Sequence, residues 1–203
     1  VGVVSALRPG SWFDHLVSVA VFAAMSFPTF FLCLLLIKWF AVDLHWLPVG
    51  GMTNTGSDES GWQYVLQVAA HLALPVLVLA YYSLASITRL TRSACLSEMN
   101  KEYILLARAK GAGEMTILLR HVLPNIRGTL LTVTALAWTS MLEGAVLTET
   151  VFSWPGIGRY LTTALFAGDT TAIMGGTLLI GVSFVLINNL TDLLVRLTDP
   201  RVR

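Results

Sequence analysis

The sequence predicts an all-α protein that crosses a membrane several times. Of its 203 residues, 55% are hydrophobic and only 12% are charged, and its mean hydropathy is +0.72. A water-soluble domain has about a quarter of its residues charged. Four stretches are also long and apolar enough to cross the hydrocarbon core, which takes roughly 20 residues of helix. The composition therefore excludes a soluble globular domain.

The four predicted spans cover residues 16–42, 68–87, 126–147 and 171–195. Lys38 lies near one end of the first span, where its long side chain can reach the headgroups. The opening stretch VGVVSALRPGSW is apolar, then basic, then contains Pro-Gly, and it has no initiator Met. We interpret it as the end of an earlier span, so that residues 1–203 form a single transmembrane domain, the C-terminal portion of a longer protein.

The distribution of positive charge predicts the orientation, because Lys and Arg in short loops stay on the cytoplasmic side. The connection after the second span and the C-terminal end are basic, with these residues: Arg89, Arg92, Lys101, Arg108, Lys110, Arg120, Arg127, Arg196, Arg201 and Arg203. Residues 43–67 have no Lys or Arg, and residues 148–170 have only Arg159. We expect these two connections outside, with four aromatic side chains at the outer interface: Trp46, Trp62, Phe152 and Trp154.

The basic inner segment, residues 93–124, has a pattern of its own. Two short amphipathic helices are predicted, separated by Gly111-Ala112-Gly113. One has Tyr103, Leu106, Ala107 and Lys110 on one side, and the other has Met115, Leu118, Leu119 and Val122. Two short helices at an angle would form a knob, and small residues would let a partner approach closely. Contact with anionic lipid headgroups is the alternative interpretation. Cys95, in this segment, should react with an impermeant thiol reagent only in opened cells.

The stretch EYILLARAKGAG…RHVLPN resembles the cytoplasmic coupling loop of ABC-importer permeases, in the version carried by the dipeptide/oligopeptide/nickel subfamily. FPTFFLCLLLI with the following WLP, HLALPVLVLAYYSLASITRLTRSACLSEM, ETVFSWPGIGRYL and LTDPRVR are similar to segments at corresponding places in those permeases. The broader family has Glu-Ala-Ala where this chain has Leu105-Leu106-Ala107, a departure that the peptide-type subfamily shares. The resemblance implies the type I ABC-importer (MetI-like) transmembrane fold in the cytoplasmic (inner) membrane of a bacterium or archaeon.

The resemblance also implies partners. Two permease subunits would form the path, two cytoplasmic ATP-binding subunits would close on ATP, and an extracytoplasmic binding protein would deliver substrate. Membrane lipid is expected around the spans and nucleic acid is not. The sequence has no GxxxxGK[ST] phosphate loop, so we expect no enzymatic activity and no cofactor in this chain, with ATP hydrolysed in the partner subunits. The implied ATPase-coupling residues are Tyr103, Ala107, Arg108, Ala109, Lys110, Gly111, Ala112, Leu123 and Pro124.

Polar residues in the spans are candidates for the translocation path or a helix interface. Glu143 lies within the third span, where an ionisable group must face a partner or a wet cavity. Small residues recur beside it at four-residue spacing: Ser140, Gly144 and Thr148. In the fourth span Asn188 precedes Asp192, and Asp192 is spaced to pair with Arg196. The outer-mouth candidates are Glu149, Trp154, Pro155 and Gly156, where Pro155-Gly156 should reverse the chain.

Short peptides are the expected substrate. No cluster of His, Cys or carboxylates is suited to a transition metal, since the four histidines (His15, His45, His71 and His121) are widely spaced. A weakly interacting polar lining is available from Ser83, Ser86, Thr139, Ser140, Asn188 and Asn189. Two alternatives remain: a nickel-chelate permease of the same family, and a proton-coupled secondary transporter that uses Glu143 and Asp192. No catalytic grouping favours an intramembrane enzyme.

Overall fold

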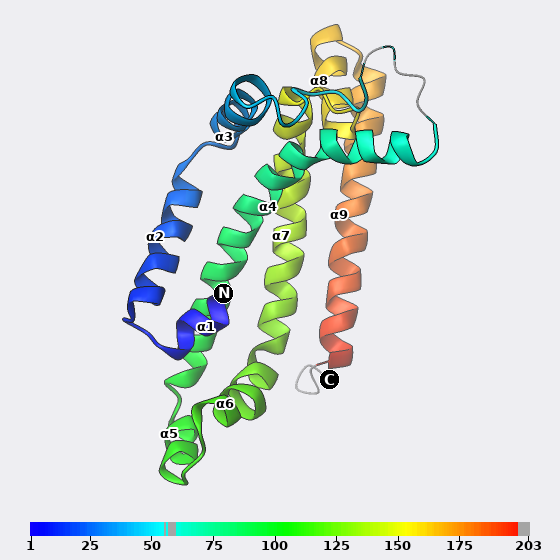
Figure 1. The fold of residues 1–203 in the computed structure, drawn as a ribbon. Helices are drawn as coiled ribbons and strands as arrows, with labels where there is room; N and C mark the ends of the chain where they lie inside the picture. The colour runs from blue at the N-terminus through cyan, green and yellow to red at the C-terminus, as the bar shows by residue number, and fades with distance from the viewer. Residues whose placement is uncertain (55, 57–59, 199–203) are drawn as a thin grey trace. The chain divides into compact units, whose positions relative to one another are not determined.

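The computed structural model describes residues 1–54, 56 and 60–198, and within this part of the chain every regular element is helical (Figure 1). The side chains of residues 142–144 and 198 lie outside the description. In chain order the elements are α1 (Gly2–Leu7), α2 (Trp12–Ser26), α3 (Thr29–Leu36), the π-helix η1 (Ile37–Asp43), α4 (Trp62–Met99), α5 (Glu102–Ala109), α6 (Glu114–Ile117), the π-helix η2 (Leu118–Val122), α7 (Leu123–Val151), α8 (Ile157–Ala167) and α9 (Thr170–Thr198). The all-α prediction is confirmed.

Among the described residues, three helical stretches are long and apolar enough to cross a membrane, and a broken pair makes a fourth if it counts as one span. The three are α4, the continuous stretch Glu114–Val151 and α9, which contain the second, third and fourth predicted spans. The broken pair, Trp12–Ser26 with Thr29–Asp43, contains the first. Pro28 is extended there, with φ −60° and ψ 136°. Its ring disfavours a helical Phe27, so the helix ends before it and a new one begins at Thr29.

Contacts divide the chain into two compact units, each with its own core. The first unit comprises Val1–Met25, Leu84–Trp138 and Val185–Arg203, and the second comprises Ser26–Ser83 and Thr139–Phe184. The first unit's core is formed by Ala6, Cys95, Met99, Ile104, Ile117, Leu118, Val122 and Ile126. Cys95 is fully buried in it. The expectation that a thiol reagent reaches Cys95 is therefore wrong, because α1 and the short helices pack over it.

The core of the second unit contains Phe152, which was expected at the outer interface. Its side chain is 1% exposed and packs with Cys33, Leu74 and Val78. The backbone N–H of Gly51 donates to the Phe152 carbonyl at 2.8 Å, and a Cβ on Gly50 would collide with the same carbonyl. Phe152 is thus a packing residue that holds the connection before α4. Trp46 and Trp62 are exposed, as the interface prediction requires.

Helix α8 falls inside residues 148–170, which were expected to form only an external connection. It begins after Gly156 and ends at Gly168, whose φ of +69° is the left-handed conformation that commonly ends a helix. The turn predicted at Pro155-Gly156 is confirmed, since α7 ends at Val151 and α8 begins at Ile157. The sequence interpretation missed this helix, although a short amphipathic pattern between two glycines, Gly156 and Gly168, indicates it.

Candidate functional site

The predicted knob is present in the first unit as α5, α6 and η2, residues 102–122, and we keep the name for these residues. Helix α5 ends at Ala109, and Gly111 has a φ of +85° before α6 begins at Glu114. The Gly111 N–H donates to the Arg108 carbonyl at 2.9 Å, and the Ala112 N–H donates to the Ala107 carbonyl at 3.1 Å. Glycine adopts a positive φ at no steric cost, whereas other residues resist it. Gly111 therefore makes the reversal between the two short helices possible.

The knob continues into α7 through the π-helix η2, which ends two residues before Pro124. A proline ring in a regular α-helix collides with the carbonyl four residues earlier, which here belongs to Arg120. The wider π-helical turn occupies the position where this collision would occur. The chain therefore continues as a helix from the knob into the membrane-spanning α7. Pro124 lies in the first turn of α7, and Leu123 packs partly buried against the core of the first unit.

The knob has one apolar side turned inward and another turned outward. Ile104, Ile117, Leu118 and Val122 are buried in the core of the first unit. Four large apolar side chains remain more than half exposed, and we call them the knob patch: Leu105, Leu106, Met115 and Leu119. The four residues that were expected on one side of the second short helix are therefore divided, because Leu118 and Val122 face the core while Met115 and Leu119 do not. Large apolar side chains left exposed on a segment outside the predicted spans are typical of a surface that another protein covers.

Tyr103 braces the knob against the helices on either side of it. Its hydroxyl donates to the carboxylate of Glu98, near the end of α4, and accepts from Asn125 Nδ2 of α7 at 3.0 Å. Asn125 Nδ2 also donates to the His121 carbonyl at 2.6 Å. Glu98 is 6% exposed and forms a second contact, with Lys101 Nζ at 2.6 Å. Sequence reasoning missed Glu98 and Asn125. The three-residue spacing between Glu98 and Lys101 was a local signal for Glu98, and no local pattern indicated Asn125.

The other predicted coupling residues surround the turn. Arg108 contacts Glu114 across it with two bonds, Nε to Oε1 at 2.8 Å and Nη2 to Oε2 at 3.0 Å, and this carboxylate raises the pKa of the Arg108 guanidinium. Both side chains are exposed, so the pair contributes little to stability. Ala107 and Ala112 pack against the core of the first unit, so their small size serves internal packing. Ala109 and Lys110 are exposed at the tip.

The four outer-mouth candidates lie together at the start of α8, in the second unit. Glu149 Oε2 accepts from the N–H groups of Gly158 at 2.7 Å and Arg159 at 3.1 Å, so its carboxylate satisfies the free donors of the helix N-terminus. The Trp154 N–H donates to the Glu149 carbonyl at 2.9 Å. A Cβ on Gly156 would collide with the Glu149 carboxylate. Pro155 is exposed and Trp154 is half-buried, so Glu149 organises this loop.

The path candidates are only partly described. Ser140 lines a cavity of about 280 Å³ in the second unit, together with Thr29, Val78, Leu79, Tyr82, Ser83, Met141 and Leu147. Glu143 and Gly144 lie on α7, but their side chains are outside the described part of the structure. Asn188 of α9 is half-buried and Asp192 is exposed. Asp192 and Arg196 are both described and exposed and form no ion pair, so the predicted helical pair is wrong.

Among the residues that the structure describes, no group of three or more His, Cys, Asp or Glu side chains could hold a metal ion.

The fold and the knob define a class: a multi-pass helical membrane protein with a braced, partly apolar projection between two of its spans. The chain belongs to the family described as the binding-protein-dependent transport system inner membrane component, whose model matches residues 1–203. Members of this family are inner-membrane components of binding-protein-dependent transport systems, which places this chain in the inner membrane. The predicted family and location are confirmed.

Curated relatives match the whole chain. It is 40% identical to the di/tripeptide transport system permease protein DppB of Pseudomonas aeruginosa, covering 64% of that protein. It is 37% identical to the dipeptide transport system permease protein DppB of Alkalihalophilus pseudofirmus and 36% identical to that of Escherichia coli, covering 65% of each. The chain thus spans less than two thirds of the length of these relatives.

A solved structure supports the fold. The MetNI methionine ABC transporter in an inward-facing conformation contains a chain similar to this one with a TM-score of 0.73 and 20% identity, over 98% of this chain and 84% of that one. The type I ABC-importer transmembrane fold predicted from the sequence is confirmed by this similarity.

Proposed function

We propose that this chain is part of a permease subunit of an ATP-driven importer, forms half of a translocation path for short peptides, and couples that path to cytoplasmic ATPase subunits through the knob. The knob is the observation that carries the proposal. It combines an exposed apolar patch with a buried inner side and a polar brace to α4 and α7. A projection braced in this way moves as one piece with the ends of the helices that flank it.

The charge distribution supports a cytoplasmic location for the knob. All Lys and Arg residues except Lys38 and Arg159 belong to the first unit, which contains the knob. Positive residues are retained on the cytoplasmic side of a membrane. The knob patch would then face the compartment that contains ATP. ATP would be bound and hydrolysed by two partner subunits, since the sequence of this chain has no phosphate loop.

The choice of peptides as substrate is supported by the relatives' names and by the cavity in the second unit. The residues that line this cavity include four that carry hydroxyl groups, Thr29, Tyr82, Ser83 and Ser140, and the others are apolar. Such a lining offers weak, adaptable hydrogen bonds and suits peptides of varied sequence. A second permease subunit would complete the path, and an extracytoplasmic binding protein would dock beside the loop that Glu149 organises.

The proposal is tested by uptake into proteoliposomes. The full-length protein is reconstituted with its ATPase, permease and binding-protein partners, then supplied with labelled di- to pentapeptides or with nickel and a chelator. We expect peptide uptake that requires internal ATP hydrolysis and the binding protein. ATP-dependent uptake of nickel alone would reject peptides and favour the nickel-chelate alternative. Uptake driven by a proton gradient without ATP would reject the importer and favour a proton-coupled transporter.

A further inference from the structure

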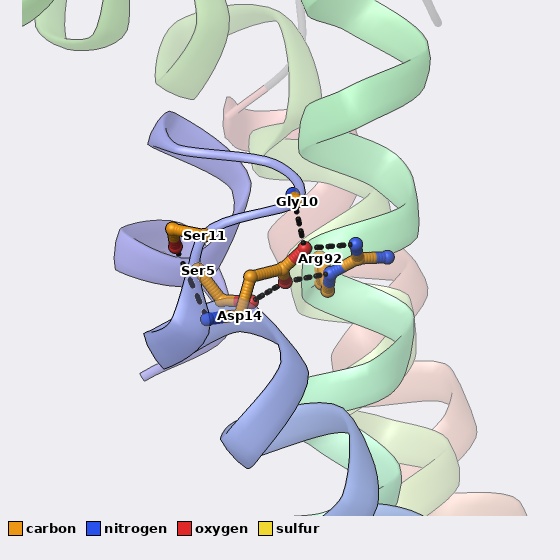
Figure 2. Close-up of polar contacts among 5 residues, drawn as sticks. All are labelled: Ser5, Gly10, Ser11, Asp14 and Arg92. Carbon is orange, nitrogen blue, oxygen red and sulfur yellow. Dashed lines mark hydrogen bonds and ion pairs between the residues drawn. The ribbon is translucent and has the colours of Figure 1, made fainter.

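Asp14, at the start of α2, forms a buried polar cluster with the turn before it and with α4 (Figure 2). Its side chain is 4% exposed and binds Arg92 with two bonds, Oδ1 to Nε at 2.6 Å and Oδ2 to Nη2 at 2.7 Å. The Ser5 hydroxyl donates to Oδ1, and the Gly10 N–H donates to Oδ2 at 3.0 Å. One carboxylate therefore ties α1, the α1–α2 turn and α2 to α4.

The segment held by this cluster also packs into the core beneath the knob. Ala6 of α1 is fully buried among Cys95 and Met99 of α4 and Ile104 and Ile117 of the knob. Gly2 lies against α4 so closely that a Cβ would stand 2.5 Å from the Thr88 carbonyl oxygen. Helix α1 thus contacts the knob's core at one point and the α4 backbone at another. The ion pair fixes the other end of the same segment, where α2 begins.

We propose that Asp14 and Arg92 are positioning residues that join the α1–α2 corner, α4 and the knob into one mechanical unit, so that movement of the knob on ATP binding is transmitted to α2. The proposal rests on the proposed importer function. Neither residue touches an ATPase or a substrate in this scheme. Both act by holding α1 in place, and the buried side of α1 packs in the same core as the knob.

Single and double variants of a buried ion pair can distinguish a role in positioning the helices from a role in stabilising the fold. Removal of one partner leaves an uncompensated charge and is strongly destabilising, whereas replacement of both partners by neutral groups is often tolerated. Asp14→Asn keeps the size of the side chain and removes its charge. The double variant Asp14→Asn/Arg92→Gln removes both charges. If the pair served only stability, the double variant would recover both abundance and coupling.

The first experiment measures peptides imported per ATP hydrolysed by the reconstituted full-length complex. We expect the ratio to fall about tenfold in Asp14→Asn, an effect of the size typical for coupling between separate sites, and to stay low in the double variant even where its melting temperature recovers. The matched control is Asp43→Asn, which breaks the exposed Lys38–Asp43 pair, also at 2.6 Å. Recovery of the ratio in the double variant, or a ratio in Asp14→Asn equal to that of the control, would overturn the proposal.

A second measurement does not depend on the substrate, so it distinguishes failure of this inference from failure of the proposed function. Spin labels are placed at the exposed positions His15 of α2 and Glu102 of α5, in the complex with its ATPase; both native cysteines are buried. We expect one narrow distance that ATP binding leaves unchanged, and a broadened or ATP-dependent distance in Asp14→Asn. An ATP-dependent distance in the unmodified protein, or identical behaviour of the variant, would refute a single mechanical unit.

Discussion

Replacement of Gly111 tests the conformation of the knob with little interference from packing. A Cβ at this position would meet nothing within 4 Å, so the effect of a substitution comes from the backbone, whose φ is +85°. A residue with a side chain loses about 1–2 kcal/mol in the left-handed conformation, and a β-branched residue loses more. That penalty lowers the population of the native turn relative to its alternatives by about 5- to 30-fold. Gly111→Val should therefore lower ATP-dependent uptake strongly.

Gly113 provides the matched control, because it lies in the same turn, has a φ of −71° and also has open space around its Cβ position. Uptake by proteoliposomes is compared for Gly111→Val and Gly113→Val at equal abundance and with the ATPase subunits bound. Gly111→Asn should fall between them, since Asn tolerates positive φ better than Val. Equal uptake by the two Val variants would refute the argument that the left-handed turn makes the knob functional.

Three further predictions concern other parts of the chain. Tyr103→Phe removes the hydroxyl that binds a buried carboxylate, so the melting temperature should fall by the equivalent of about 1.5–3 kcal/mol; an unchanged melting curve would contradict the brace. Gly156→Ala should destabilise the outer loop by collision with a carboxylate, whereas Gly175→Ala, with nothing within 4 Å of its Cβ position, should be neutral; circular dichroism melts compare them. An impermeant thiol reagent should label Ser60→Cys in sealed cells and Thr116→Cys only in opened cells, and the reverse pattern would overturn the orientation.

Hydropathy and local backbone chemistry made much of the fold predictable. The spans in α4, α7 and α9 follow from long apolar windows, since the bilayer core sets the length of the helix. The turn at Gly111 follows from a glycine between two amphipathic patterns. Pro28 was less informative, because proline occurs within many membrane helices and residues 16–42 are apolar on both sides of it. The break at Phe27 and Pro28 was therefore missed.

Tertiary contacts account for what the sequence could not predict. Asp14 and Arg92 are 78 residues apart, and no local pattern pairs them. Cys95 is buried because α1 and the knob cover it, and the Phe152 side chain is buried because it packs with Cys33 of α3 and with Leu74 and Val78 of α4. Such burial depends on which segments meet. Periodicity along one helix carries no information about it.

The most direct test of the central claim asks what covers the knob patch. A photo-crosslinking amino acid is introduced at Leu106, which is 57% exposed on the knob, or at Leu197, which is 67% exposed on α9, in the full-length protein within intact membranes. We expect Leu106 to capture the ATP-binding subunit and Leu197 to capture none of it. Capture of lipid alone at Leu106, with the assembled complex present, would contradict the account of the knob as the contact with the ATPase.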